Sequence, residues 1–550
     1  MSFWLRGEDS GELHYTALSQ SSSPKSPTND RFEEKMMQAA ASSAAYKRAA
    51  QTLKRLSITM LFSIVFLLLT FLIATFTMNQ EGRGLLKLTP DQNDTAQLID
   101  SYIGDVEVFL HDHPNSLADS TTFAQMGLFT RMYARMLQDH RIKEEVLDAY
   151  ESSLWFFIPG VRELRRRHTY NRLSNVSFNG NKKGRGIAIS VGRNTFLFAN
   201  HFIATIRDVH KSQMPIEIVY RDEEDLPLFM RNYLTSTFTN VKMLGLKGTP
   251  VFDNKEVGAQ GWATKAFAVV ASQFSQVILA DVDTILLEPP ETFFEEEDYK
   301  KSGTLFFSDR NVDDYRETIN DWILDQLGEK SRGPSKSLEE SYFWKHVTHY
   351  RQESGVVVVD KRRAHVFASL LFTAWMNLQV IRDQVTYWLF HGDKESFWLA
   401  FELARLPYYM NNHGAGNLGS KHHLKSPDEF CGEHPLHFFE APEGSPVLPG
   451  MEETPKPPAH QRPLSKPAWI NGSLRNNKYG GGSSHKMLDP DHTIWSMDGT
   501  WYYSGQAGAL CQSNYTEHGL GEFGLYDRVK SIVKAGGDAE KKAKVYLDSI

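Results

Sequence analysis

QVILADVDTILLEPP, residues 276–290, places two carboxylates one residue apart, Asp281 and Asp283, directly after an apolar run. A continuous apolar run is typical of a strand that is buried on both faces of a parallel sheet. In open α/β sheets, ligands bind beyond the carboxyl ends of such strands. The stretch therefore predicts two acids at the working edge of a sheet, where they could hold a divalent cation against phosphate oxygens.

Strands and helices alternate upstream of these acids. GRGIAISVG (184–192) and PIEIVYR (215–221) are predicted strands, and apolar residues at helical spacing in 194–210 separate them. This is a βαβ unit, which implies a parallel sheet with right-handed crossovers. A weaker strand is predicted in 239–246 and a helix in 261–274. The fold class predicted from this pattern is α/β with a mostly parallel central sheet.

Downstream, GTLFFSDR (303–310) and SGVVVVDKR (354–362) are further predicted strands, and 364–378 is a predicted helix. Residues 411–490 are rich in Gly, Pro and His and are predicted to form a long surface loop or insertion. The last helix is predicted at 526–548.

Composition excludes some functions. The 550 residues carry a net charge of −7 that is spread along the chain, which argues against a nucleic-acid surface. The two cysteines, Cys431 and Cys511, do not have the spacing of zinc ligands. In an oxidising compartment they could form a disulfide, whereas in the cytosol they would remain thiols.

Residues 56–78 contain no charge, and a helix of this length crosses a hydrocarbon core of about 30 Å. Basic residues are more numerous before this span than after it, so the positive-inside rule predicts a cytosolic N-terminus. The sequons at Asn93, Asn175, Asn471 and Asn514 lie beyond the span and agree with this orientation. The chain is predicted to be a single-pass type II membrane protein.

Five segments are expected along the chain. They are a disordered cytosolic tail (1–55), a transmembrane helix (56–78), a partly helical lumenal stem (79–180), a catalytic domain (181–480) and a C-terminal extension that packs on it (481–550).

Four stretches carry a resemblance to a known family: GRGIAISVG, KAFAVVASQFSQVILADVDTILLEPPETFF, QESGVVVVDK and GDKESFWLAFEL. Over residues 180–480 the chain resembles the fungal Golgi α-1,3-mannosyltransferases, and GDKESFWLA (392–400) is the most specific stretch. This family consists of type II membrane enzymes with a GT-A fold that use GDP-mannose and manganese. The resemblance implies retention of the anomeric configuration and transfer of mannose to a mannose-containing glycan on glycoproteins, in the Golgi lumen. It also implies a Golgi glycosyltransferase complex as a partner.

The resemblance implies a donor-binding set around the first strand and the acidic loop. Its members are Gly184, Gly186, Ser190, Gly192, Lys265, Asp281 and Lys478. Glycines permit close approach of backbone to nucleotide, and lysines would complement the diphosphate. For these residues the alternatives are a tight turn, a solvated helix lysine and a surface lysine. Trp262, close to Lys265, is expected to be a packing residue.

Asp281 and Asp283 are the predicted metal ligands. GT-A enzymes often add a late histidine, for which His437 is the first candidate and His434 the second. The similar pair Asp489 and Asp491 follows no apolar strand and is predicted to form a turn.

Asp393, Glu395 and Glu353 are the candidate catalytic acids. One of them could orient the acceptor hydroxyl or stabilise an oxocarbenium-like transition state. Helix capping and an ordinary loop acid are the alternatives. A front-face mechanism, in which the leaving phosphate takes the acceptor proton, needs no protein base, whereas double displacement needs a carboxylate nucleophile. Asn471 forms a sequon in a stretch that resembles a site element, and it cannot carry a glycan if it lines the site.

Two other functions stay open at this point. The chain could use a different sugar nucleotide, such as UDP-glucose or UDP-galactose, because the diphosphate machinery is shared. It could also be an inactive lumenal subunit of a glycosyltransferase complex.

Overall fold

The computed structural model describes residues 120–139, 141–169, 184–247, 261–312, 317–327, 333–411, 413–420, 424–426, 429–431, 434–441, 464–475, 486–497, 499–503 and 510–550. They all belong to one unit, Gln92–Ile550. The predicted tail (1–55) and transmembrane helix (56–78), the sequons at Asn93 and Asn175, and Lys478 lie outside the described residues.

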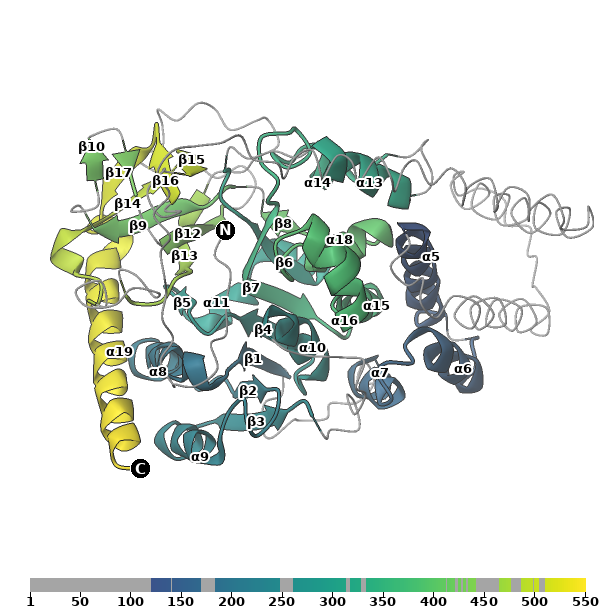
Figure 1. The fold of residues 1–550 in the computed structure, drawn as a ribbon, viewed down its shortest axis with the longest axis horizontal. Coiled ribbons are helices and arrows are strands. Elements are labelled where there is room, and N and C mark those ends of the chain that lie inside the picture. Colours follow the sequence, from purple (N-terminus) through teal and green to yellow (C-terminus); the bar gives the residue numbers. More distant parts are fainter. Residues whose placement is uncertain are drawn as a thin grey trace, which may run out of the picture. The chain divides into compact units, whose positions relative to one another are not determined.

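A seven-stranded sheet forms the centre of this unit, in the order β3-β2-β1-β4-β7-β6-β8 (Figure 1). Its strands are β1 (Arg185–Ser190), β2 (Ile216–Tyr220), β3 (Val241–Gly245), β4 (Gln276–Ala280), β6 (Thr304–Ser308), β7 (Gln352–Asp360) and β8 (Met410–Asn411). Strands β1 to β4 pair in parallel, whereas β7 runs antiparallel to both β4 and β6. The prediction of an α/β fold with a mostly parallel central sheet is confirmed.

The central strands are buried on both faces, as their apolar runs predict. In β4, Val277 and Leu279 contact one hydrophobic core, while Ile278 and Ala280 contact another. Successive side chains of a strand point to opposite faces, so one apolar run serves two layers of helices.

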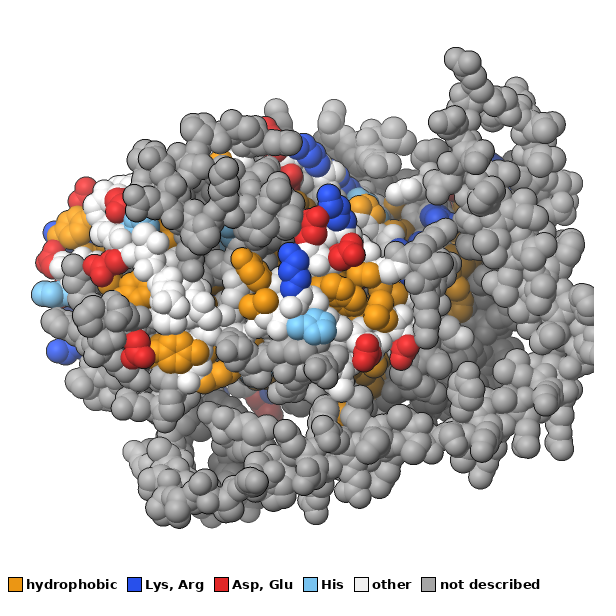
Figure 2. All heavy atoms as spheres, turned by 90° about the horizontal axis from the view of Figure 1, so that it is seen from above, with side chains coloured by type: hydrophobic (Ala, Val, Ile, Leu, Met, Phe, Trp, Pro, Cys, Tyr) orange, Lys and Arg blue, Asp and Glu red, His pale blue; other side chains and the backbone are white. Residues whose placement is uncertain are grey.

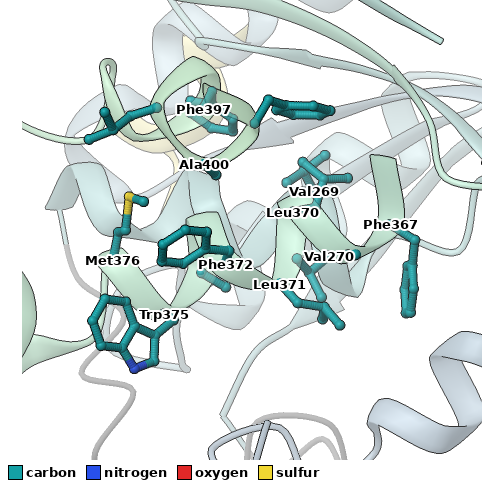
Figure 3. Packing of buried hydrophobic residues seen from close by; sticks show 14 of the residues in the cluster. Val269, Val270, Phe367, Leu370, Leu371, Phe372, Trp375, Met376, Phe397 and Ala400 are labelled. Atoms are coloured by element: carbon teal, nitrogen blue, oxygen red, sulfur yellow. The ribbon is translucent and has the colours of Figure 1, made fainter. Parts of the chain in front are cut away.

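One layer consists of α10 (Thr264–Ala271), α15 (Ala364–Met376) and α18 (Ser396–Leu403), with α5 (Ser120–Met136) packed outside them. Figure 3 shows Val269, Leu370 and Phe397 from these three helices meeting in this core. In the part of the chain that the structure describes, no single helix is long and apolar enough to cross a membrane. Only α15 together with the bent segment through Leu389 passes that test as a pair, and α15 is a buried core helix.

The other layer contains α8 (Phe196–Ala204), α9 (Leu228–Thr237) and the C-terminal helix α19 (Leu525–Asp548). Helix α19 lies along α8, and His201 of α8 contacts Glu540 of α19 with 2.7 Å between Nε2 and Oε2 (Figure 1). The predicted last helix is confirmed. The remaining helices are α6 (Glu144–Leu154), α7 (Val161–Thr169), α11 (Pro290–Phe293), α12 (Glu297–Ser302), α13 (Glu317–Leu327), α14 (Lys336–Glu339), α16 (Gln379–Ile381) and α17 (Tyr387–Leu389).

Two antiparallel sheets follow the central one. A six-stranded sheet has the order β17-β14-β9-β12-β13-β5, and a four-stranded sheet has the order β10-β11-β16-β15. The strands are β5 (Ile285–Leu286), β9 (Gly416–Ser420), β10 (Leu424–Ser426), β11 (Glu429–Phe430), β12 (His434–Glu440), β13 (Leu464–Ile470), β14 (Thr493–Met497), β15 (Thr500–Tyr503), β16 (Leu510–Ser513) and β17 (Thr516–Gly519). The prediction of a loop over 411–490 is therefore wrong for the described part of that segment.

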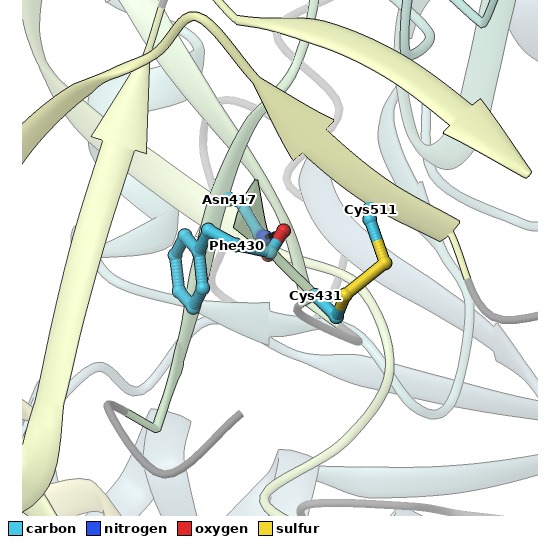
Figure 4. Close-up of a disulfide and its surroundings, with 4 residues drawn as sticks. All are labelled: Asn417, Phe430, Cys431 and Cys511. Carbon is cyan, nitrogen blue, oxygen red and sulfur yellow. Dashed lines mark hydrogen bonds between the residues drawn. A yellow bond between two sulfur atoms is a disulfide. The ribbon is translucent and has the colours of Figure 1, made fainter. Parts of the chain in front are cut away.

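Cys431 and Cys511 form a disulfide, which answers the question that the sequence left open. Figure 4 shows it at the end of β11, beside Phe430, whose carbonyl accepts a hydrogen bond from the Asn417 side chain. The bond closes a sequence separation of 80 residues and joins β11 to β16.

Candidate active site

The two aspartates of the opening stretch lie where the chain passes from one sheet to another. Strand β4 of the central sheet ends at Ala280, and β5 of the six-stranded sheet begins at Ile285. The turn between them is fixed to β7, because the Asp281 N–H and the Thr284 hydroxyl both donate to the carbonyl of Gly355, at 2.9 and 3.0 Å. The acids are therefore held at the carboxyl edge of the parallel strands, as predicted.

Gly355 is the residue of QESGVVVVDK that allows this junction to close. A Cβ at this position would lie 2.6 Å from the ring of Trp469 and 3.2 Å from Thr284 Oγ1. Real Cβ atoms do not approach other atoms this closely, so any side chain would push β13 away from the acidic turn.

Lys265, at the beginning of α10, lies at the centre of the site. Its Nζ is 3.0 Å from Asp281 Oδ1 and 3.2 Å from Asp393 Oδ2, and it donates a 2.8 Å hydrogen bond to Ser354 Oγ. Burial alone would lower the pKa of Lys265, but the two carboxylates raise it above the ordinary value. The ammonium therefore stays charged, and it joins three segments that are far apart in sequence.

Asp281 has the opposite tendency. Burial raises the pKa of this carboxyl to about 7, Lys265 opposes the shift, and Asp283 adds to it. A second positive charge at the turn would therefore favour the ionised form of Asp281.

Asp393 and Glu395 precede α18, as the sequence predicts for this stretch, but they face different partners. Asp393 contacts Lys265, and its backbone carbonyl accepts from Ser396 at the start of the helix. Glu395 is fully buried and accepts hydrogen bonds from the N–H groups of Arg351 and Gln352 and from the Trp398 indole. Asp393 is therefore the acid of this pair that takes part in the lysine cluster.

Glu353 lies at the start of β7, buried, and its Oε1 accepts from the Gly355 N–H at 3.0 Å. Burial and Asp309 raise its pKa, while Lys394 and Arg310 lower it. Asp309 in turn forms ion pairs with Lys394 and Arg310. Sequence analysis missed this second charged group, although Asp309 follows the end of β6 and so obeys the same strand-end rule as Asp281.

The four residues predicted around β1 do not stay together. Ser190 is the last residue of β1. Because Ile189 pairs with Ala280, Ser190 lies level with Asp281. The Ser190 hydroxyl is buried and has no hydrogen-bond partner in the described part of the chain. Gly192 follows, and a Cβ there would lie 2.7 Å from Asp225 Oδ1.

Gly184 and Gly186 lie at the other end of β1, so the structure does not bring them to the site. At about 3.3 Å per residue, four residues of strand put Gly186 roughly 13 Å from Ser190. Gly184 has φ +59° and accepts from Ser275 and Gln276, while a Cβ at Gly186 would lie 2.3 Å from the Phe274 ring. Their expected nucleotide contact is replaced by a turn and a packing role.

His437 is not joined to the aspartates. Among the described residues, no group of three or more His, Cys, Asp or Glu side chains could hold a metal ion. The His437 ring stacks on Trp469 with centroids 3.9 Å apart, and burial lowers its pKa to about 3. His434 lies three residues earlier on the same strand, buried opposite Leu418 of β9. The structure therefore gives the histidine next to Trp469 a packing position instead of the expected third-ligand position.

The segment 471–475 borders the acidic turn. The N–H of Ser473 donates to the Asp283 carbonyl at 2.6 Å, and both Gly472 and Ser473 have positive φ. Asn471 donates its N–H to Pro435, and its Oδ1 is buried with no partner in the described residues. The sequon asparagine thus lies beside the candidate site.

The arrangement suits chemistry on an anionic group. A charged lysine, two adjacent acids able to hold a cation and a ring of further buried charges meet at one sheet edge. Preorganised charges of this kind stabilise charge that develops on a leaving group.

Comparisons with known proteins agree with the motifs. Residues 184–438 match the family described as "Mannosyltransferase putative". The chain is 26% identical over 317 residues to the "Putative alpha-1,3-mannosyltransferase MNN1" of Candida albicans, and 27% over 279 residues to "Alpha-1,3-mannosyltransferase MNN1" of Saccharomyces cerevisiae. These matches cover 47% and 43% of this chain and 38% and 35% of the relatives, so the chain spans less than half the length of either.

Solved glycosyltransferases also match over part of the chain. The Mn/GDP form of "Core-mannan synthase A" from Aspergillus fumigatus is 10% identical with a TM-score of 0.23, covering 40% of this chain and 69% of that one. The sequence comparisons confirm the resemblance to fungal α-1,3-mannosyltransferases and the prediction of a glycosyltransferase family.

Proposed function

Because residues 184–438 belong to a mannosyltransferase family, we propose that this chain transfers mannose from GDP-mannose to a mannose-containing glycan, forming an α-1,3 linkage with retention. The observation that carries the proposal is the position of Lys265, whose ammonium lies within 3.2 Å of carboxylates from two separate segments at the end of β4. A permanently charged group there would complement a departing nucleoside diphosphate.

The residues present fit a divalent cation. Asp281 and Asp283 supply hard oxygen ligands, and the raised pKa of Asp281 means that a nearby cation would favour its ionised form. A bound Mn²⁺ would neutralise charge on the diphosphate leaving group. Further ligands would come from the donor, since two carboxylates alone do not complete a coordination shell.

The reaction breaks the bond between the anomeric carbon and the phosphate oxygen, and forms a bond from that carbon to an acceptor hydroxyl. The hydroxyl proton goes to the leaving phosphate in the front-face mechanism. The buried acids Glu353 and Asp393 would hold sugar hydroxyls and stabilise positive charge on the ring. Burial raises the pKa of Asp393, and Lys265 opposes this rise and contacts the carboxylate at 3.2 Å.

We assign the chain to the Golgi membrane as a type II protein, with residues 56–78 as its anchor and the described unit in the lumen. The Cys431–Cys511 disulfide supports this, because disulfides persist in oxidising compartments. A Golgi glycosyltransferase complex remains the proposed partner.

The test is a donor-by-metal matrix on the full-length chain in detergent, with α-mannobiose as acceptor. GDP-mannose with Mn²⁺ should give a product that NMR assigns as α-1,3, while UDP-glucose, UDP-galactose or chelator should not.

Asp281→Asn should lower kcat/KM by about 10²–10³-fold. Asp489→Asn is the matched control, since Asp489 belongs to the similar DPD triplet but accepts hydrogen bonds from Asp491 and His492 in an exposed turn. Equal activity of Asp281→Asn and wild type would refute the role of Asp281, and a wild type that forms no product with any donor or metal would favour an inactive subunit.

A further inference from the structure

An aromatic cluster lies beside the segment that carries Asp393. Trp262 is 57% exposed and Tyr503 is 48% exposed, values that are unusual for such large rings. The expected packing residue Trp262 does contact Gly392, but more than half of it stays exposed. On the face shown in Figure 2, uncovered hydrophobic side chains lie beside acidic, basic and histidine side chains.

Trp262 is tied directly to the catalytic acids. Its ring lies on the backbone of Gly392, where a Cβ would approach it to 2.7 Å, and Gly392 immediately precedes Asp393. Lys265 follows Trp262 by three residues in the chain. The centroid of the His391 ring is 5.3 Å from that of Trp262.

Two tyrosines extend the cluster. The Tyr350 ring stands perpendicular to His391 at 6.2 Å, and its hydroxyl is 3.2 Å from that of Tyr503. Lys394 lies over the Tyr350 ring, 4.0 Å from its centroid. Burial, aided by Lys394, lowers the pKa of His391 to about 4, so this ring is uncharged near neutral pH.

We infer that Trp262, Tyr350, His391 and Tyr503 form the acceptor subsite, a platform on which a pyranose ring of the glycan stacks beside Asp393. This inference rests on the proposed function and names where its acceptor binds. A pyranose presents C–H groups on its faces and hydroxyls around its rim. The rings supply an apolar surface, and the adjoining tyrosine hydroxyls and Lys394 supply polar groups for the rim.

Position favours a sugar acceptor over the guanine of the donor. Tyr350 lies two residues before β7, which flanks β4 on one side, whereas Ser190 ends β1 and Gly192 follows it, and β1 flanks β4 on the other side. Tyr350 and the residues expected to meet the nucleotide are thus on opposite sides of β4.

The experiment compares Trp262→Ala, Trp262→Phe and the control Phe156→Ala in the full-length chain. Phe156 is an exposed aromatic between α6 and α7, away from the elements that carry the cluster. We expect Trp262→Ala to raise the KM for α-mannobiose at least tenfold and to change the KM for GDP-mannose much less. Trp262→Phe should recover part of the loss, and Phe156→Ala should match wild type.

An unchanged KM for α-mannobiose in Trp262→Ala would overturn the inference. An increase confined to the KM for GDP-mannose would also overturn it, because it would indicate that Trp262 contacts the nucleotide base. Calorimetric binding of α-mannobiose provides a readout that needs no turnover. If wild type neither hydrolyses nor transfers from GDP-mannose, the proposed function fails. Loss of α-mannobiose binding in Trp262→Ala would still establish the platform, and equal binding would refute it.

Discussion

The two ends of α10 each meet a buried lysine, and the two lysines are held in opposite ways. Lys361 donates to the carbonyls of Val269 and Ser272 at the C-terminal end, at 3.0 and 2.6 Å. A cation there complements the helix dipole and satisfies carbonyls that the helix leaves open. Lys265 lies at the N-terminal end, where the dipole opposes a positive charge, and two carboxylates hold it in place.

The difference shows in the charge of the two groups. Burial lowers the pKa of Lys361 to about 7, with Glu217 opposing the shift, while Asp281 and Asp393 keep the pKa of Lys265 raised. Lys265 lies against the helix dipole and beside acids at a sheet edge, so we expect it to have a functional role. Lys361 lies with the dipole at the opposite edge and stabilises the fold.

The largest effect should come from Lys265→Met. We expect kcat to fall about 10³-fold, equivalent to roughly 4 kcal/mol of transition-state stabilisation, because the charge facing the leaving group is lost. Initial rates with GDP-mannose and α-mannobiose measure this. Lys361→Met is the matched control and should keep the wild-type kcat per folded molecule. A similar loss of kcat in both variants would erase the proposed distinction.

Lys361→Met should instead lower the free energy of unfolding by about 1–3 kcal/mol, since it leaves two carbonyls without a donor and removes a charge that lowers the pKa of the buried Glu217. Urea unfolding monitored by circular dichroism measures the change. Adding Glu217→Leu should recover part of the loss, because it removes the uncompensated carboxylate. If the single variant unfolds like wild type, the structural role is refuted.

Strands differ in how well the sequence predicts them. β4 could be predicted because QVILA is apolar on both faces, and the end of this strand fixes where the acids lie. β9, with the sequence GNLGS, is fully buried without any apolar alternation, so its pairing depends on β12 and β14, which are distant in sequence. Local pattern cannot encode such partners.

The site shows the same limit. Asp281 was predicted because it follows an apolar strand, whereas Lys265 and Asp393 were predicted from stretches that resemble the family. The partners of Glu395 come from β7, the exposure of Trp262 depends on Gly392, and His437 packs on a neighbouring strand. Each of these depends on contacts between segments far apart in the chain.

Asp393→Asn sharpens the comparison with a smaller effect. We expect kcat to fall about 10–100-fold, because Lys265 keeps Asp281 but loses its second acid, with the free energy of unfolding nearly unchanged. Glu395→Gln is the control from the same turn. It should cost about 1–3 kcal/mol of unfolding free energy, since an amide cannot accept all the hydrogen bonds that the carboxylate accepts. The reverse pattern would exchange the roles of the two acids.

The pH dependence of stability should show the smallest difference. Lys361 has a folded pKa of about 7, below its unfolded value of about 10.4, so between these values the unfolded chain binds more protons. The free energy of unfolding contributed by Lys361 therefore rises with pH across this window, by at most about 1.4 kcal/mol per pH unit, and is lost as pH falls toward 7. Lys265, whose pKa is raised, adds no such slope between pH 7 and 10. Urea titrations at about pH 7.5, 8.5 and 9.5 measure this slope. The slope should appear in wild type and in Lys265→Met, and it should be absent in Lys361→Met. A slope that persists in Lys361→Met would show that a group other than Lys361 causes it, and would refute the assignment of this slope to the lysine at the C-terminal end of α10.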